Sequence, residues 1–394
     1  MILRTASLFS QLLQEFPRDK FQALVKFHKA DKGSKGFSTW EQFVAMLFCQ
    51  MAQAKSLREV EGGLACCLGK LAHLGLKTAP PRSTLSYANA HRPPQFFEDL
   101  FYQTLDRVQA YAPKKKLRFK NKLMSLDSTV ISLCLSLYDW AKYRRAKGAA
   151  KVHLVLDHDG YLPCFALITD GKKADVSVAQ NLVFPAETVV AFDRGYNDYA
   201  LFGVWTGERV WFVTRMKEGT AYEVVERREV PKNRNILSDE VIRLAGKDAE
   251  KKCPHRLRRV VVWDKENERE IVLLSNHLKF GATTIADIYK ERWQIELFFK
   301  AIKQNLKIKT FVGTSENAVR IQIWTALIAM LLLKLMQFRS RWGWSLSNLV
   351  ALLRWNLFTY RDLWAWLDDP FDTPPLNPES MQLALPIQGL GQPI

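Results

Sequence analysis

The chain is poor in cysteine for its length. Its 394 residues include six, at positions 49, 66, 67, 134, 164 and 253. None of them form a CxxC pair, and no histidine stands at the spacing of a zinc ligand. This excludes a disulfide framework and a cysteine-based zinc site, so we expect reduced thiols in a cytosolic protein.

Long apolar runs are also missing. The N-terminal segment contains Glu15 and Asp19 and has no continuous apolar stretch, so we expect no signal peptide. The most apolar segment, residues 321–336, is interrupted by Gln322 and Lys334. It is shorter than the roughly 20 residues that a membrane span needs. We interpret it as a buried helix and expect no membrane partner.

Acidic residues are too few to balance the basic ones. There are 57 Lys and Arg residues against 40 Asp and Glu residues, which gives a formal net charge of +17. Such an excess favours a polyanionic partner, of which nucleic acid is the usual one, although a merely soluble basic protein is the alternative. The length allows two or three domains, and 48% hydrophobic residues are enough for sizeable cores.

The first part of the chain, residues 1–112, is predicted to be an all-helical, DNA-binding domain. Ser38 with Glu41, and Ser56 with Glu59, are capping-box patterns that precede apolar-periodic runs. Ser83 is expected to open a short polar helix that ends before Pro93. This helix either reads a DNA groove or only packs between proline loops, and the sequence leaves both open.

The rest of the chain is predicted to be α/β. Residues 113–216 read as three strands, a helix, a strand, a helix and a strand, and residues 217–282 as a β-rich insertion. Residues 283–340 return to helix, with Thr284 and Asp287 as a possible cap, and residues 341–394 form C-terminal helices and a tail.

The segment YKERWQIELFFKAIK carries the strongest local signal. Because each helical residue turns about 100°, one stripe roughly 80° wide collects a tyrosine, a single carboxylate and four cations. Large apolar side chains, among them Trp293, fall outside this stripe. The members of the stripe are Tyr289, Arg292, Glu296, Lys300, Lys303 and Lys307.

Two interpretations of this stripe compete. Arg292, Glu296 and Lys300 have the i, i+4 spacing of a surface salt-bridge ladder, in which each pair contributes a few tenths of a kcal/mol. A phosphate-facing surface around one metal ligand, Glu296, also explains the excess of cations and the aromatic residues on the other faces. We favour the second interpretation.

Two aspartates occur on predicted strands. Asp127 interrupts an apolar strand, where a buried charge needs a cation or a hydrogen-bond network, unless it serves as a cap or turn. Asp193 follows the strand TVVAF, at a strand end where α/β sheets place their sites, unless it forms an Asx-turn. With Glu296 these residues would form an oxygen-only site. Two Mg²⁺ ions, or Mn²⁺, prefer such hard ligands.

These residues resemble bacterial insertion-sequence transposases of the DDE class with a Tyr-Arg-Glu-Lys signature, the IS-four type. Tyr289, Arg292, Glu296 and Lys303 match the signature at every spacing. The segments LDST and DRGY, at Asp127 and Asp193, resemble the first and second carboxylate motifs. The resemblance covers about residues 115–340. It implies an RNase H-like catalytic core, whose second part would be residues 283–340.

The resemblance further implies the reaction and its partners. Asp127, Asp193 and Glu296 would be the catalytic, metal-binding residues. The residues expected to bind DNA are Tyr289, Arg292, Trp293, Lys300 and Lys303. The substrates would be terminal inverted repeats and target DNA, held by a homodimer in a synaptic complex. The expected steps are nicking, a hairpin intermediate and strand transfer, in the cytoplasm and associated with the nucleoid.

Trp293 matches a position at which some relatives stack an aromatic side chain on a displaced base. A second such aromatic is missing from the strand 271–275, and Trp263 is a substitute candidate. Two other functions remain open: a nuclease on the same fold that cuts without joining, and a transposase-derived repressor or inactive remnant.

Overall fold

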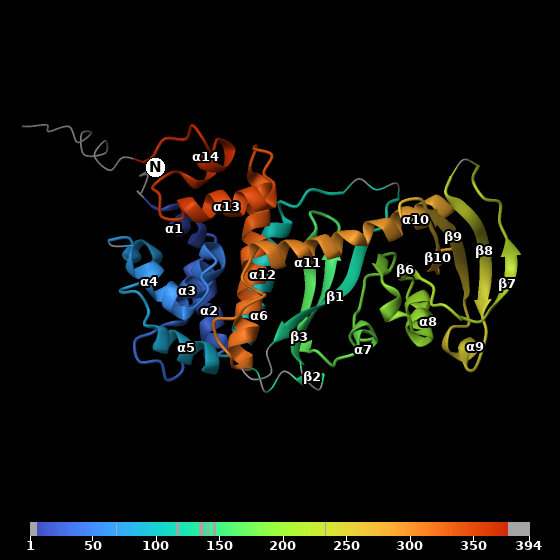
Figure 1. Cartoon of the computed structure of the whole chain (residues 1–394), viewed down its shortest axis with the longest axis horizontal. Coiled ribbons are helices and arrows are strands. Elements are labelled where there is room, and N and C mark those ends of the chain that lie inside the picture. The colour runs from blue at the N-terminus through green and yellow to red at the C-terminus, as the bar shows by residue number, and fades with distance from the viewer. Residues whose placement is uncertain are drawn as a thin grey trace, which may run out of the picture. The chain divides into compact units, whose positions relative to one another are not determined.

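The computed structural model describes residues 6–376, except for residues 68, 116, 118, 134–137, 139, 141, 145–146 and 233. Cys134 therefore lies outside the described residues. The chain divides into two compact units (Figure 1). The first combines residues 1–111 with residues 304–394, and the second contains residues 112–303.

The first unit is built from helices in the part that the structure describes, as the sequence predicts for residues 1–112. Its helices are α1 (Leu8–Leu13), α2 (Arg18–Phe27), α3 (Thr39–Ala52), α4 (Leu57–Ala65), η1 (Leu71–Leu74), α5 (Arg82–His91), α6 (Gln95–Gln109), α12 (Glu316–Arg339), α13 (Leu346–Asn356) and α14 (Leu363–Asp368).

The helix starts confirm Ser38 and Ser56 as N-caps and correct the predicted start of α5. Ser38 and Glu41 form a complete capping box at α3. At α4 the hydroxyl of Ser56 accepts from the amide of Glu59, but the Glu59 carboxylate accepts from the backbone of Lys55, so only half of the second box is present. Helix α5 begins one residue before Ser83, at Arg82, because Pro81 supplies the preset φ of a helix entry.

Helix α12 contains the apolar segment 321–336. By length and composition it could cross a membrane, but 89% of its most apolar window is buried inside the protein. It packs against α3, α5, α6 and α13 of its own unit. The prediction of a buried helix is therefore confirmed.

The second unit alternates strands and helices. Its elements are β1 (Leu123–Leu133), β2 (Lys142–Arg144), β3 (Lys147–Asp157), β4 (Leu162–Asp170), α7 (Asp175–Ala179), β5 (Val189–Phe192), η2 (Arg194–Tyr196), α8 (Tyr199–Gly207), β6 (Trp211–Arg215), β7 (Tyr222–Arg227), β8 (Ile236–Leu244), α9 (Ala249–Lys252), β9 (Arg256–Asp264), β10 (Arg269–Ser275), α10 (Ala282–Glu291) and α11 (Trp293–Asn305). The last two residues of α11 belong to the first unit.

All of these strands form one 10-stranded sheet, which confirms a mixed α/β protein. From one edge the order is β4, β3, β1, β5, β6, β10, β9, β8 and β7, and the short β2 pairs with the start of β3. Strands β1, β5 and β6 run parallel. The strands from the predicted insertion, β7 to β10, continue this sheet, because β10 pairs antiparallel with β6.

Each face of the sheet has its own core. Val190 and Phe192 of β5 point to the face that packs with α8, and Val189 and Ala191 point to the face that packs with α10. This alternation follows from the period of two in a strand. The same alternation assigns each remaining side chain of β1 and β5 to one of the two faces.

Helices α10 and α11 are separate, which corrects the single helix expected through Tyr289 and Lys307. The amide of Arg292 donates to the carbonyl of Tyr289, and the amide of Ile295 donates to the carbonyl of Arg292, both at 3.2 Å. These i→i+3 bonds tighten the backbone between the helices. Lys307 lies beyond the end of α11. Helix α10 starts at Ala282 with Gly281 as its N-cap, so Thr284 is not a cap.

Candidate active site

Asp127 and Asp193 occupy equivalent positions on neighbouring parallel strands. Leu126 of β1 pairs with Phe192 of β5, so the next residue of each strand is one of the two aspartates. Adjacent strands lie about 4.8 Å apart, which brings both carboxylates to one level of the sheet. Asp193 follows the last residue of β5 and is the N-cap position of η2.

The pleat directs both aspartates to the side of α10 and α11. Leu126 and Phe192 belong to the core under α8, so the residues that follow them point to the opposite face. That face is covered by α10, whose Ile285 and Ile288 pack on β5 and its neighbours. The two aspartates therefore face the same side as Glu296.

Arg292 connects Asp127 to Glu296. Its guanidinium lies 2.7 Å from the Glu296 carboxylate and 3.8 Å from the Asp127 carboxylate. Arg292 is 9% exposed, and its Nε has no hydrogen-bond partner. The i, i+4 pair expected for a salt-bridge ladder therefore exists, but it is buried against a strand carboxylate. Lys300, by contrast, is exposed.

The electrostatics of Asp127 reflect its crowded surroundings. Burial, together with the negative charges of Glu296 and Asp193, raises the pKa of Asp127 to about 6. The amide of Ser128, at 2.8 Å, and the charge of Arg292 act in the opposite direction. A carboxyl group whose neighbours disfavour its charge has a strong affinity for an added cation.

Two further contacts connect β1 to α10 and α11, and they start from the residues two positions before and two positions after Asp127. On one side of Asp127, Ser125 bonds His158 at 2.7 Å, and the other ring nitrogen of His158 is 3.7 Å from Glu291. On the other side, Lys303 donates to the hydroxyl of Thr129 at 2.6 Å. Burial lowers the pKa of His158 to about 4, so this histidine is neutral at pH 7.

Comparisons with known proteins show the family to which the chain belongs. A family model described as a transposase DDE domain matches residues 118–332, and one described as a domain of unknown function (DUF4372) matches residues 4–77. The chain belongs to the family of transposases with a DDE domain.

Relatives in bacteria are also named as transposases. A Sinorhizobium fredii protein named as a transposase, y4zB, is 35% identical over 65% of this chain and 72% of its own length. A Synechocystis protein named as a transposase for insertion sequence element IS4SA is 25% identical over 72% of this chain and 80% of its own. These matches confirm the resemblance to IS-four transposases and the prediction that the chain is a transposase.

A solved structure with a similar backbone comes from a piggyBac transposase synaptic complex with hairpin DNA. It has a TM-score of 0.45 and 10% sequence identity, and the match covers 99% of this chain and 87% of that chain.

The transposase also contains a polar cluster that the sequence analysis missed. On the opposite face of β1, the hydroxyl of Ser128 donates to Asp175 at 2.7 Å, and Lys151 is 2.8 Å from the same carboxylate. His153, fully buried, lies 3.4 Å from it. Burial alone would raise the pKa of Asp175, but these hydrogen bonds hold it well below its ordinary value. Only strand pairing reveals this cluster.

The other predicted DNA-binding residues lie around the break between the helices. The ring of Tyr289 is 5.4 Å from the Arg292 guanidinium, and burial raises the pKa of its hydroxyl. Trp293, the first residue of α11, is 53% exposed. Trp263 follows Val262 of the α10 face, so the pleat directs it to the opposite face from Asp127. Trp293 is therefore the better candidate for base stacking.

The carboxylates fit a divalent metal by chemistry but are not gathered into a metal cage. Among the described residues, no group of three His, Cys, Asp or Glu side chains stands close enough to hold an ion. Arg292 lies between Asp127 and Glu296 and provides positive charge there. The donor set is oxygen-only, and burial disfavours the charge of Asp127 unless a cation compensates it, so the residues fit Mg²⁺ or Mn²⁺.

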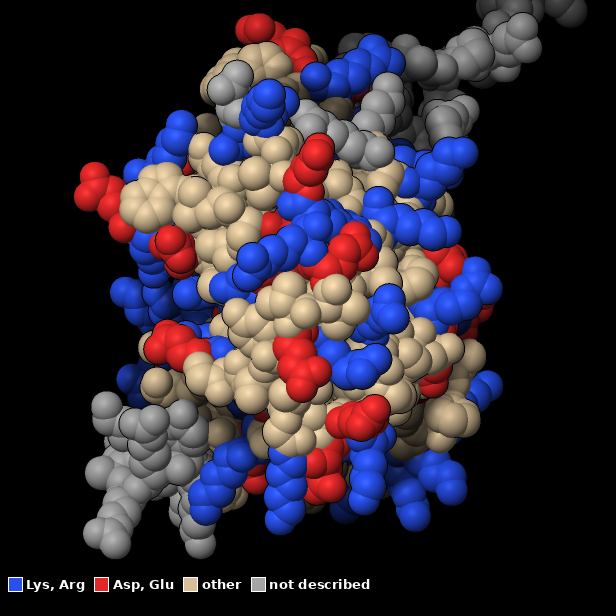
Figure 2. Space-filling view, turned by 90° about the vertical axis from the view of Figure 1, so that its right-hand side faces the viewer, with Lys and Arg blue, Asp and Glu red and all other residues tan. Residues whose placement is uncertain are grey.

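Positive charge is not restricted to the neighbourhood of these carboxylates. Figure 2 shows the face formed by the outer strands of the sheet, where many Lys and Arg side chains are interspersed with Asp and Glu. Exposed cations of β7 and α9 include Arg227 and Lys251. The strands beyond β6 thus present a mixed surface with a basic excess.

Proposed function

We propose that this transposase excises and inserts a bacterial insertion sequence by divalent-metal-dependent phosphoryl transfer at Asp127, Asp193 and Glu296. The observation that carries the proposal is the register of β1 and β5, which sets two aspartates side by side on the face that α10 covers. Arg292 links Asp127 of β1 to Glu296.

The three carboxylates would hold two Mg²⁺ ions, with Mn²⁺ as a substitute. Bound there, the ions would supply activation of a water or 3′-hydroxyl and charge stabilisation on the leaving oxygen. Asp127 must lose its proton to bind a cation, and its raised pKa means that this happens only above about pH 6 without metal. Ser128 and its partner Asp175 would hold the Asp127 carboxylate in one orientation.

The basic and aromatic side chains of α10 and α11 would hold the cut DNA end. Arg292 already pairs with carboxylates, and it would exchange one of them for a phosphate when a metal compensates their charge. Lys303, Lys300 and Tyr289 would contact phosphates. Trp293 is exposed enough to stack on a displaced base, which supports a hairpin intermediate.

Further parts of the proposal concern assembly. We infer an RNase H-like core from strands β4, β3, β1, β5 and β6, in which three central strands run parallel. We also infer a homodimer that pairs two terminal inverted repeats, working on nucleoid DNA in the cytoplasm. Sizing the protein–DNA complex in solution tests the dimer, since a 1:1 complex with one end would contradict it.

A joining assay with pre-cut transposon ends tests the function. Purified full-length protein with Mg²⁺ is expected to transfer the 3′ ends into plasmid DNA, and Asp193→Asn is expected to abolish the transfer. Cleavage of uncut ends without any joining would identify a nuclease instead. Specific end binding with neither reaction, in Mg²⁺ and in Mn²⁺, would identify a repressor or an inactive remnant.

A further inference from the structure

Helix α5 presents a polar surface that no packing contact explains. Its inner side buries Leu85, Ala88 and Asn89. Since each residue turns about 100°, its exposed residues cover about half of the helix circumference. These exposed residues are Arg82, Ser83, Ser86, Tyr87 and His91.

The exposed aromatic pair on this surface is preformed. Tyr87 is 68% exposed, and its ring stacks on that of His91 with centroids 4.0 Å apart. His91 also bonds the carbonyl of Tyr87 through its Nδ1 at 2.8 Å. The pair therefore presents two aromatic rings with polar edges at fixed positions on the outer surface of α5.

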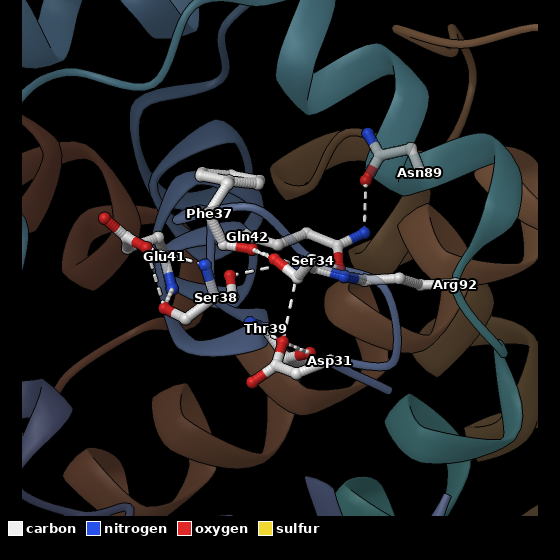
Figure 3. A network of polar contacts seen from close by, with 9 residues as sticks. All are labelled: Asp31, Ser34, Phe37, Ser38, Thr39, Glu41, Gln42, Asn89 and Arg92. Atoms are coloured by element: carbon white, nitrogen blue, oxygen red, sulfur yellow. Dashed lines mark hydrogen bonds and ion pairs between the residues drawn. The ribbon is translucent and has the colours of Figure 1, made fainter. Parts of the chain in front are cut away.

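The inner side of α5 is fixed by a dense polar network (Figure 3). Arg92, directly after the helix, donates to the carbonyl of Ser38 at 3.0 Å and to the side chain of Gln42 at 3.1 Å, and it also contacts the carbonyl of Phe37. Gln42 in turn donates to Asn89 at 2.8 Å. Such anchoring holds the outer surface of the helix in one orientation.

The charge around α5 is suited to a polyanion. No Asp or Glu occurs between Glu61 and Glu98, whereas Lys77 and Arg82 lie exposed just before and at the start of the helix. The nearby loop tied to Arg92 exposes Lys32 and Lys35. Cations flanking a helix that presents short polar side chains match duplex DNA, with phosphates at the sides and base edges in the groove.

We propose that α5 is the helix that reads the terminal inverted repeat, by lying in the major groove of duplex DNA. Ser83, Ser86, Tyr87 and His91 contact base edges, and Arg82 contacts the phosphate backbone. The proposal rests on the transposase function above and adds the reading element to it. Helix α5 lies between residues 77 and 118, outside both matched family domains.

Binding of full-length protein in EDTA tests this assignment. The probes are a duplex that carries the terminal repeat flanking the gene and a scrambled duplex of the same length. Tyr87→Ala with His91→Ala is expected to weaken repeat binding roughly 10- to 100-fold and scrambled binding less than about 3-fold. Arg82→Ala should weaken both probes alike and lower the salt slope by about 1.

The matched control is Trp355→Ala, which removes a 74% exposed aromatic from α13 of the same unit. It should bind both probes like the wild type. Unchanged repeat affinity and discrimination in the Tyr87→Ala, His91→Ala variant would overturn the assignment. So would equal losses on both probes, because these residues would then not read sequence.

A second measurement is independent of affinity. Ser86→Cys, labelled with a DNA-cleaving iron chelate, should cut within the repeat beyond the background of the labelled wild type. Absence of such cuts in a complex that still binds the repeat would also overturn the assignment. If the wild type neither distinguishes the repeat nor joins pre-cut ends, the proposed transposase function fails as well. If the wild type distinguishes the repeat and joins pre-cut ends, and the α5 variants behave like the wild type, only the α5 assignment fails.

Discussion

Arg92 and Arg292 are nearly equally buried, at 8% and 9% exposure, yet their surroundings differ in kind. Arg92 donates to backbone carbonyls and to Gln42, and it pairs with one carboxylate, Asp31, at 3.3 Å. Arg292 contacts two carboxylates, and its Nε has no partner. Burial lowers the pKa of Arg92, whereas Tyr289 and the neighbouring carboxylates outweigh burial and raise that of Arg292.

The difference separates a structural arginine from one at the proposed reaction site. Around Arg92 the polar groups are satisfied, and the network resists any change of partner. Around Arg292 two carboxylates share one guanidinium, so negative charge is left for a metal to compensate. Burial alone would not distinguish these two arginines, but hydrogen-bond satisfaction and local charge balance do.

The largest expected effect is that of neutralising Glu296, the carboxylate paired with Arg292. Glu296→Gln removes a proposed metal ligand while keeping the shape of the side chain, so end cleavage should fall by roughly 10³-fold or more. Binding to the terminal repeat should stay within about 3-fold of the wild type. Gel assays of cleavage and binding on the same end duplex measure both, and cleavage at the normal rate would contradict the assignment.

The two arginines themselves give the second contrast. Arg92→Ala leaves Asp31 and several buried acceptors unpaired, so it should cost about 3–5 kcal/mol of stability, unaffected by Mg²⁺. Arg292→Ala should lower stability in EDTA, and Mg²⁺ should restore much of the loss because the ion replaces the missing positive charge. Thermal unfolding with and without Mg²⁺ tests this. Equal behaviour of the two variants would remove the distinction.

The sequence predicts those features of the site that depend on local contacts, and it misses those that depend on contacts between distant segments. The positions of Asp127 and Asp193 were predictable because Asp127 lies within the apolar strand β1 and Asp193 directly follows the apolar strand β5. The helical position of Glu296 was predictable because its segment repeats a recognisable pattern. The cluster at Asp175 was not, since it depends on the pairing of β1 with β3. The break at Arg292 was missed because two i→i+3 bonds leave no clear mark in a helical sequence.

The fold shows the same limit. Strands were expected in residues 217–282, but not that β10 would pair with β6 and continue the sheet. That pairing joins residues about 60 positions apart, and hydrophobic periodicity carries no information on such partners. Likewise, α12 lies in the same unit as residues 1–111, whereas the resemblance assigned it to residues 283–340 of the catalytic core.

The aspartates beside the two arginines should respond to neutralisation with opposite signs. The raised pKa of Asp127 means that its charge destabilises the fold as pH rises from about 4 to 6 and above. Asp127→Asn should therefore stabilise the metal-free protein at pH 7 by about 1–3 kcal/mol, and not at pH 4. Asp31 accepts from the amide and hydroxyl of Thr39, so Asp31→Asn should destabilise by about 1–2 kcal/mol.

Denaturant unfolding of both variants at pH 4 and pH 7 measures this pair of effects. If Asp127→Asn destabilised the protein at pH 7, its carboxylate would be a structural partner of Arg292, like Asp31 beside Arg92, and the contrast between the two networks would be lost.

The smallest expected effect concerns Lys303, whose amine reaches Thr129 two residues beyond Asp127. Removing one phosphate contact should speed release of the cleaved end roughly 10-fold and lower the salt slope by about 1, with little change in the Mg²⁺ dependence of cleavage. Lys290→Ala is the matched control, because Lys290 is exposed on α10 outside the stripe of Glu296. If both variants release the end equally fast, the Lys303 effect reflects only net charge, and the side chain serves to hold α11 against β1.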